Sequence, residues 1–231
     1  MPRHDGRDAN QLREVSIEPT AHSAAAAGVL VRFGRTTVLC SASVAEDVPP
    51  WMAGKGCGWV TAEYNMLPGS TTPRKPRERG KPDGRSTEIQ RLIGRSLRAG
   101  VDFESLGERT VTVDCDVLVA DGGTRTASIT GGWVALARAL RGVADGALRQ
   151  AIAAVSVGVV AGDAALDLDY REDSSAAVDM NVVGAAGGRL VEVQGGGEGA
   201  TFTPTQLAEL VELAMPGLTR LEETQAIAIG R

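Results

Sequence analysis

The sequence predicts an α+β fold in which layered β-sheet is packed by a few helices. Several segments alternate apolar and polar residues at the period of a half-buried strand, and two-residue turns typical of hairpins join some of them. Other segments repeat apolar residues at helical spacing. No proline- or serine-rich linker divides the 231 residues, so we expect one domain over residues 1–231.

The composition indicates an aliphatic core. Hydrophobic residues make up 43% of the chain and aromatic residues only 3%, so Val, Leu, Ile and Ala must fill the interior. The N-terminal residues form no apolar signal segment, and no stretch approaches the length of a membrane helix, so we expect a cytoplasmic protein without membrane contact. Cys40 and Cys115 fall in strand patterns and Cys57 lies between glycines, which favours buried or incidental thiols over metal ligands or nucleophiles.

The first part of the chain is predicted to be β structure. A short strand is expected at residues 15–17. Residues 29–33 and 36–44 should pair as a hairpin through Gly34 and Arg35, and residues 59–64 should add a further strand. These elements form the beginning of a sheet.

A loop and a helix are predicted next. Prolines and glycines break every pattern over residues 67–84, which indicates a long exposed loop. A helix is expected from Ser86 onward, because two kinds of side chain recur there on different faces. The apolar face carries Ile89, Leu92, Ile93 and Leu97, and the basic face carries Arg91, Arg95 and Arg98.

The central feature is a strand that leads through a glycine turn into a helix. Residues 110–119 alternate as a strand, residues 121–126 form the turn, and residues 133–140 have helical spacing. Free N–H groups at a helix start favour an anion, and Arg125 offers a planar fork matched to phosphate oxygens. A merely tight turn would also explain Gly-Gly-Thr, but the arginine favours an anion site. The spacing of a Walker loop or a dinucleotide fingerprint is absent.

The second half is predicted to build more sheet and to end in helices. Residues 154–160 and 165–169 should form a hairpin through Gly162 and Asp163, followed by strands at 180–183 and 190–193. The glycine run 195–199 is interpreted as a strand-to-helix connector. Two helices are then expected, at residues 205–214 and 218–228, separated by Pro216 and Gly217.

Basic residues are concentrated in one segment of an otherwise acidic chain. The net charge is −5, yet residues 74–98 hold nine basic and three acidic residues, a net charge of +6 that leaves −11 elsewhere. A solvated surface is one interpretation of such a run. A proline-stiffened basic loop beside a helix carrying arginines fits a polyanion backbone better.

Acidic residues gather in a second segment. Five carboxylates fall within thirteen positions, and such a set favours a hard cation such as Mg²⁺; they are Asp167, Asp169, Glu172, Asp173 and Asp179. Asp167 and Asp169 alternate with leucines and are expected on a solvated rim, whereas Asp173 and Asp179 flank a turn and a strand start and are better metal ligands. His4 and His22 have no partner arrangement that suggests acid–base catalysis.

The chain resembles the ribonuclease PH family along nearly its whole length. The resemblance rests on residues 58–64, 66–68, 84–93, 114–118, 120–130, 172–174, 179–183 and 192–195. It implies a ribonuclease PH-type βαβα domain, like the second domain of ribosomal protein S5. It also implies a phosphate-dependent 3′→5′ exoribonuclease that removes terminal nucleotides of tRNA precursors as nucleoside diphosphates and can add nucleotides in reverse.

The resemblance also implies roles for individual residues. Inorganic phosphate as co-substrate would be bound by Arg85, Gly123, Thr124 and Arg125, and Mg²⁺ by the catalytic Asp173 and Asp179. RNA would contact Arg74, Arg77, Arg79 and Arg91, and the chain would form a homo-oligomeric ring, a hexamer built as a trimer of dimers. Departures from the family pattern at Ala24–Ala27, Asn65 and Gly184 touch none of the phosphate or metal positions. A catalytically silent RNA-binding ring subunit and a metal-dependent hydrolytic nuclease remain the alternatives.

Overall fold

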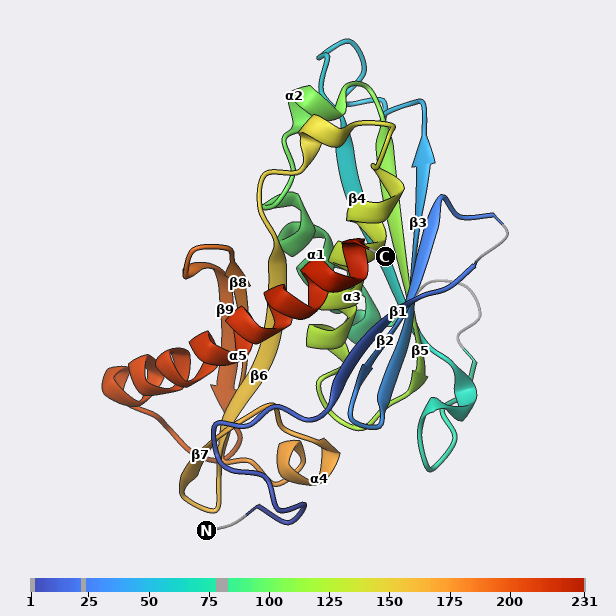
Figure 1. Cartoon of the computed structure of the whole chain (residues 1–231). Coiled ribbons are helices and arrows are strands. Elements are labelled where there is room, and N and C mark those ends of the chain that lie inside the picture. The colour runs from blue at the N-terminus through green and yellow to red at the C-terminus, as the bar shows by residue number, and fades with distance from the viewer. Residues whose placement is uncertain (1–2, 22–23, 78–82, 231) are drawn as a thin grey trace.

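The computed structural model describes residues 3–21, 24–77 and 83–230, which form an α+β structure with two sheets (Figure 1). The first sheet has the strand order β1-β2-β3-β5-β4. Its strands are β1 (Val15–Pro19), β2 (Ala27–Phe33), β3 (Thr36–Ala45), β4 (Trp59–Met66) and β5 (Thr110–Val119). The β4–β5 pair is parallel and the other three pairs are antiparallel. The predicted hairpin and central strand are confirmed.

The second sheet is antiparallel and has the order β7-β6-β8-β9. Its strands are β6 (Ile152–Val160), β7 (Asp163–Leu166), β8 (Val178–Ala185) and β9 (Arg189–Gly197). Two predictions are corrected here. Strand β7 ends at Leu166 and not at Asp169, because the Asp169 side chain caps the short helix α4 (Tyr170–Asp173). Gly195, Gly196 and Gly197 belong to β9 and pair with β8, so this part of the glycine run is not a connector.

Helix α3 (Thr124–Ala139) packs between the two sheets, against β2, β3 and β5 on one side and β6 and β8 on the other (Figure 1). Nearly all of its residues are buried, which explains why its polar–apolar contrast is weak in sequence. Gly131 allows the close approach to the first sheet, because a Cβ at this position would lie 2.6 Å from Cγ1 of Val31. This helix is therefore distinguished by its burial between the sheets and not by an amphipathic pattern.

The first α-helix of the chain packs beside α3. Helix α1 (Gly84–Arg98) packs on β4 and α3, and the Asp83 side chain caps it by accepting from the Ser86 backbone N–H at 2.6 Å. The predicted apolar face of α1 is buried. The short elements α2 (Phe103–Leu106), η1 (Pro68–Ser70) and η2 (Asp145–Ala147) lie in connections.

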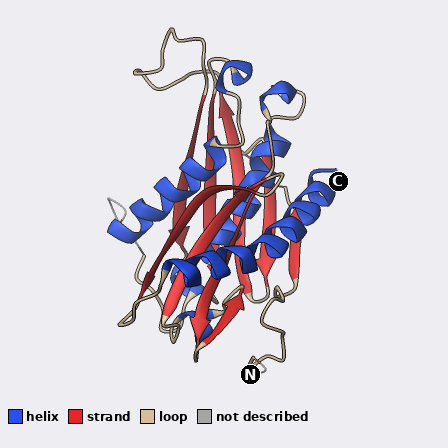
Figure 2. Ribbon diagram, turned by 90° about the vertical axis from the view of Figure 1, so that its left-hand side faces the viewer, coloured by secondary structure: helices blue, strands red, loops and turns tan. Residues whose placement is uncertain are grey.

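Helix α5 (Pro204–Gly230) is one continuous helix, where the sequence predicted two. Pro216 lacks a backbone N–H and would end many helices. Here the buried positions Leu210, Ala214, Leu218 and Leu221 continue one apolar face through the proline, so packing outweighs the lost hydrogen bond. Figure 2 shows α5, ending at the C-terminus, running obliquely along the strands. Within the described ranges, no helix combines the length and apolarity needed to cross a membrane.

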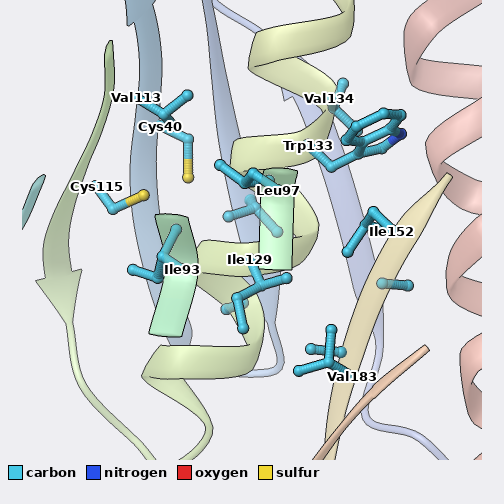
Figure 3. Close-up of a cluster of buried hydrophobic side chains, with 14 of the residues drawn as sticks. Cys40, Ile93, Leu97, Val113, Cys115, Ile129, Trp133, Val134, Ile152 and Val183 are labelled. Carbon is cyan, nitrogen blue, oxygen red and sulfur yellow. The ribbon is translucent and has the colours of Figure 1, made fainter. Parts of the chain in front are cut away.

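The core is aliphatic, as predicted, and extends from α1 through α3 to the second sheet (Figure 3). Cys40 and Cys115 lie opposite each other on β3 and β5 as buried free thiols, and each lies within 4 Å of the Ser128 carbonyl oxygen. The contact with Cys115 and complete burial raise the pKa of the Cys40 thiol well above its usual range. A thiol held protonated in this way is a packing residue, not a nucleophile.

Candidate active site

The turn between β5 and α3 is shaped by two glycines in the left-handed region. Gly122 has φ 75° and Gly123, the N-cap residue of α3, has φ 66°. A Cβ at Gly122 would lie 2.5 Å from the backbone carbonyl carbon of Asp169, so the turn sits directly on the segment that precedes α4. No side chain caps α3, and its first N–H groups are therefore left to face an anion.

Thr124 and Arg125 follow this turn as the first residues of α3. The Thr124 hydroxyl lies 2.9 Å from the Tyr64 hydroxyl of β4. Burial raises the pKa of Tyr64, so this phenol stays a neutral hydrogen-bonding group. Thr124 is thus fixed by a neighbouring strand.

Arg125 is bound by a residue of α1, which a residue of β9 binds in turn. Its Nη2 donates to Glu88 Oε2 on α1 at 2.9 Å, and Gln194 Nε2 on β9 donates to Glu88 Oε1 at 2.9 Å. The Nε of Arg125 is buried and has no hydrogen-bond partner among the residues that the structure describes. An orphaned buried donor on an arginine at a helix start is a ready position for a phosphate oxygen.

Asp173 and Asp179 come from α4 and β8 and lie within electrostatic range of this turn. Burial raises the pKa of Asp173, while the charges of Arg85, Arg125 and Arg13 oppose the rise. Burial raises the pKa of Asp179 to about 6, with a further contribution from the negative charge of Asp173. The predicted phosphate residues and the predicted carboxylates therefore share one electrostatic environment.

The two carboxylates fit a hard divalent cation. Both are partly buried, and repulsion between them contributes to the raised pKa of Asp179. A bound cation would relieve that repulsion, and carboxylate oxygens are the ligands that Mg²⁺ prefers. Asp173 and Asp179 would hold it.

The prediction of a solvated rim at Asp167 and Asp169 is wrong. Asp167 is fully buried and its Oδ1 accepts from Arg13 Nη2 at 2.7 Å. Arg13 Nη1 also donates to the Asp121 carbonyl oxygen at 2.7 Å. The N-terminal segment covers this edge, and alternation with leucines along the chain could not reveal a partner 154 positions away.

The same N-terminal segment contacts α4. Glu172 is bound by Arg3 and Arg7, and His4 Nε2 lies 2.6 Å from Asp169 Oδ2, so His4 does have an acidic partner. His4, Asp169 and Glu172 offer ligand atoms within 4.8 Å of one another. Their hydrogen bonds to arginines and to the start of α4 explain the cluster without a metal. His22 lies outside the described residues.

The basic segment is only partly available to a ligand. Arg74, Arg77 and Arg91 are exposed, and Arg79 lies outside the described residues. Arg95 pairs instead with Glu192 at 2.6 Å, and the Arg98 guanidinium lies 4.6 Å from the ring centre of Trp59. The basic face of α1 is thus divided between an open part and a structural part.

Two hollows among the described residues are not lined by the phosphate residues or the two aspartates, although Arg13 lines the larger one. One of about 300 Å³ lies at the start of β2 beside Arg138 and Arg141, and one of about 760 Å³ lies between residues 8–15 and α5. Arg138 and Arg141 donate to carbonyl oxygens at the end of α5. Charge and hydrogen-bonding chemistry, and not hollow size, therefore locate the candidate site.

Sequence reasoning missed four residues of the site. Arg13, Tyr64, Glu88 and Gln194 fix the turn, Thr124 and Arg125, yet none lies in a local pattern that marks it. Tyr64, Glu88 and Gln194 fall within the segments that carry the family resemblance, which is the one available signal.

Comparison with known proteins identifies the relatives of this chain. The model of the 3′ exoribonuclease family, domain 1, matches residues 11–141, and that of domain 2 matches residues 150–217. Ribonuclease PH of Rhodopirellula baltica is 57% identical, covering 96% of this chain and 97% of that protein. Ribonuclease PH of Saccharopolyspora erythraea is 55% identical, covering 99% and 95%.

Solved structures share the fold at lower identity. The Archaeoglobus fulgidus exosome with RNA bound to its active site matches with a TM-score of 0.80 at 22% identity, covering 96% of this chain and 91% of that one. An archaeal exosome core matches with a TM-score of 0.77 at 21% identity. These structures support the fold.

Proposed function

The chain belongs to the 3′ exoribonuclease family that includes ribonuclease PH, and from this premise we propose how its candidate site works. Its similarity to ribonuclease PH identifies it as a phosphorolytic 3′→5′ exoribonuclease and nucleotidyltransferase. Such an enzyme acts on tRNA and uses inorganic phosphate as co-substrate. We propose that Arg85, Gly123, Thr124 and Arg125 bind this phosphate. The buried, unpartnered Nε of Arg125 is the observation that carries the assignment.

In the proposed reaction, an oxygen of the bound phosphate attacks the terminal phosphodiester in line. The attacking oxygen forms a new bond to the phosphorus of the phosphodiester. The bond from that phosphorus to the 3′-oxygen of the penultimate nucleotide breaks. The products are a nucleoside diphosphate and RNA shortened by one residue with a free 3′-hydroxyl. The arginines and the helix N–H groups hold the phosphate in position for this attack.

Asp173 and Asp179 are proposed to complete the site. A Mg²⁺ ion held there would neutralise charge that develops on the transferred phosphoryl group. One of these two carboxyl groups is also proposed to assist proton transfer to the leaving 3′-oxygen. The catalytically silent subunit is disfavoured, because both arginines and both aspartates are present.

The remaining proposals concern RNA and assembly. The exposed Arg74, Arg77 and Arg91, together with Arg79, are proposed to contact RNA phosphates. The solved exosomes that share the fold support an oligomer, and we propose a hexamer built as a trimer of dimers. The free thiols are compatible with the cytoplasm as its location.

The test of phosphorolysis is product analysis. RNA with a free 3′ end should be shortened only when phosphate is present and should release nucleoside diphosphates, as separated by thin-layer chromatography. With nucleoside diphosphates and no phosphate, the RNA should be extended. Nucleoside monophosphates released in phosphate-free buffer would instead identify the hydrolytic nuclease.

A further inference from the structure

We infer that Glu88 is a positioning residue for phosphate, acting through Arg125, with Gln194 holding Glu88 in turn. This inference rests on the proposed role of Arg125 and extends it to two residues outside the turn. Glu88 lies three residues after Arg85 on α1, so the helix that carries one phosphate arginine also carries the acceptor for the other.

The hydrogen bonds fix the direction of every group in this bridge. The Glu88 carboxylate can only accept, and it accepts from Arg125 Nη2 and from Gln194 Nε2, each at 2.9 Å. The bridge thus joins α1, α3 and β9, three elements that are distant in sequence. Because Nη2 is committed to Glu88, the guanidinium plane of Arg125 cannot rotate freely.

The bridge is incomplete without a ligand. Five buried side-chain polar atoms lack a partner among the described residues, and two of them, Arg125 Nε and Gln194 Oε1, belong to this bridge. A buried unpaired polar atom is costly, so two in one bridge indicate a place where a ligand supplies the missing partners. The donor Nε–H suits a phosphate oxygen, and the Gln194 carbonyl suits a hydroxyl.

A positioning role and a purely electrostatic role predict opposite results. Glu88 is an anion beside the arginine that binds an anion, so through charge alone its removal should tighten phosphate binding. Through positioning, its removal should release Arg125 and weaken phosphate binding. The sign of the change in the KM for phosphate therefore separates the two.

The experiment measures the KM for phosphate and the KM for RNA of the full-length protein. Glu88→Ala should raise the KM for phosphate about fivefold to tenfold and leave the KM for RNA nearly unchanged. Glu88→Gln should stay within about threefold of wild type, because its amide oxygen can still accept from Arg125 while the Gln194 amide turns over. Gln194→Ala should raise the KM for phosphate about twofold to threefold, since Glu88 keeps one of its two partners.

A matched control is the ion pair that links α1 to β9, as the Glu88–Gln194 hydrogen bond also does. Arg95 of α1 donates to Glu192 of β9 through Nε at 2.6 Å and through Nη2 at 2.8 Å. Glu192→Ala should leave the KM for phosphate unchanged. If it raised this KM as much as Glu88→Ala does, loosened docking of α1 would explain both and the inference would be overturned.

A double-variant cycle completes the test. Arg125→Ala alone should lower kcat/KM for phosphate about a hundredfold, and adding Glu88→Ala should change it no further. Independent, multiplicative effects would overturn the inference, as would an unchanged or lowered KM in Glu88→Ala. If Glu88→Ala does not fold, an unchanged KM for phosphate in Gln194→Ala would overturn the inference instead. Cleavage by wild type without phosphate would instead refute the proposed function itself.

Discussion

At the scale of the residue, Asp179 combines a functional advantage with a cost in stability. Burial and the charge of Asp173 raise its pKa to about 6, so ionising it is less favourable in the folded protein than in the unfolded chain. A carboxyl in an unfolded chain ionises near its ordinary value of 3.8. Between these two pKa values the carboxyl ionises in the unfolded chain but stays protonated in the folded protein. Rising pH in this range therefore lowers the free energy of unfolding. The metal-free site is therefore under electrostatic strain that a cation would relieve.

We expect Asp179→Asn to stabilise the metal-free protein while abolishing activity. The stabilisation should grow as pH rises from about 4 to about 6 and stay constant above that, reaching on the order of 2–3 kcal/mol, since one pKa unit is worth about 1.36 kcal/mol. Urea unfolding of both proteins, in the presence of a chelator and over a series of pH values, measures this stability difference. A stability difference that does not change with pH would show that Asp179 titrates normally.

At the scale of the element, the N-terminal segment secures the site from outside the turn. Arg13 reaches Asp167 and the Asp121 carbonyl oxygen, while Arg3 and Arg7 bind Glu172 beside Asp173. Arg13 and Asp167 have side-chain exposures of 6% and 0%. This burial decides their importance, because a buried charge that loses its partner is far more costly than an exposed one.

Asp167→Ala should therefore destabilise the protein by roughly 3–5 kcal/mol, because it leaves the Arg13 guanidinium buried without its carboxylate partner. The control is Glu18→Ala, which breaks the exposed Arg32–Glu18 pair at 3.1 Å and should cost no more than about 1 kcal/mol. Denaturant unfolding of both variants makes the comparison. Equal losses in the two variants would mean that burial at Asp167 has no special effect.

At the scale of the whole molecule, the basic loop is separate in the chain from the elements that carry the candidate site. Arg74 and Arg77 are exposed and precede α1, whereas the residues proposed to bind phosphate and Mg²⁺ belong to α1, α3, α4 and β8 or lie beside them. Binding of a structured RNA can therefore be separated from the reaction at its 3′ end.

Replacing Arg74, Arg77 and Arg79 together with alanine should weaken binding of a tRNA precursor, most strongly at low salt. Each lost phosphate contact should reduce the slope of log K against log salt by about 0.7–0.9. Turnover of a short single-stranded oligonucleotide should stay near wild type, provided that light scattering shows an intact oligomer. Dissociation with loss of both activities would assign the loop to assembly, and an unchanged slope would make it a solvated surface.

The sequence by itself determined most of the strands, the glycine turn and the family, whereas the loop predicted to be exposed contains a 3-10 helix with Pro68 and Ser70 buried. The features determined by the sequence are recorded in local patterns, because alternation, turn glycines and charge runs involve residues that are neighbours in the chain. Only the tertiary structure decided that Asp167 is buried against Arg13, that Pro216 lies inside one helix, and that Glu88 and Gln194 hold Arg125. Each of these depends on a partner or a packing surface supplied by a distant segment. Burial and pairing, which set their energies, exist only once the chain has folded.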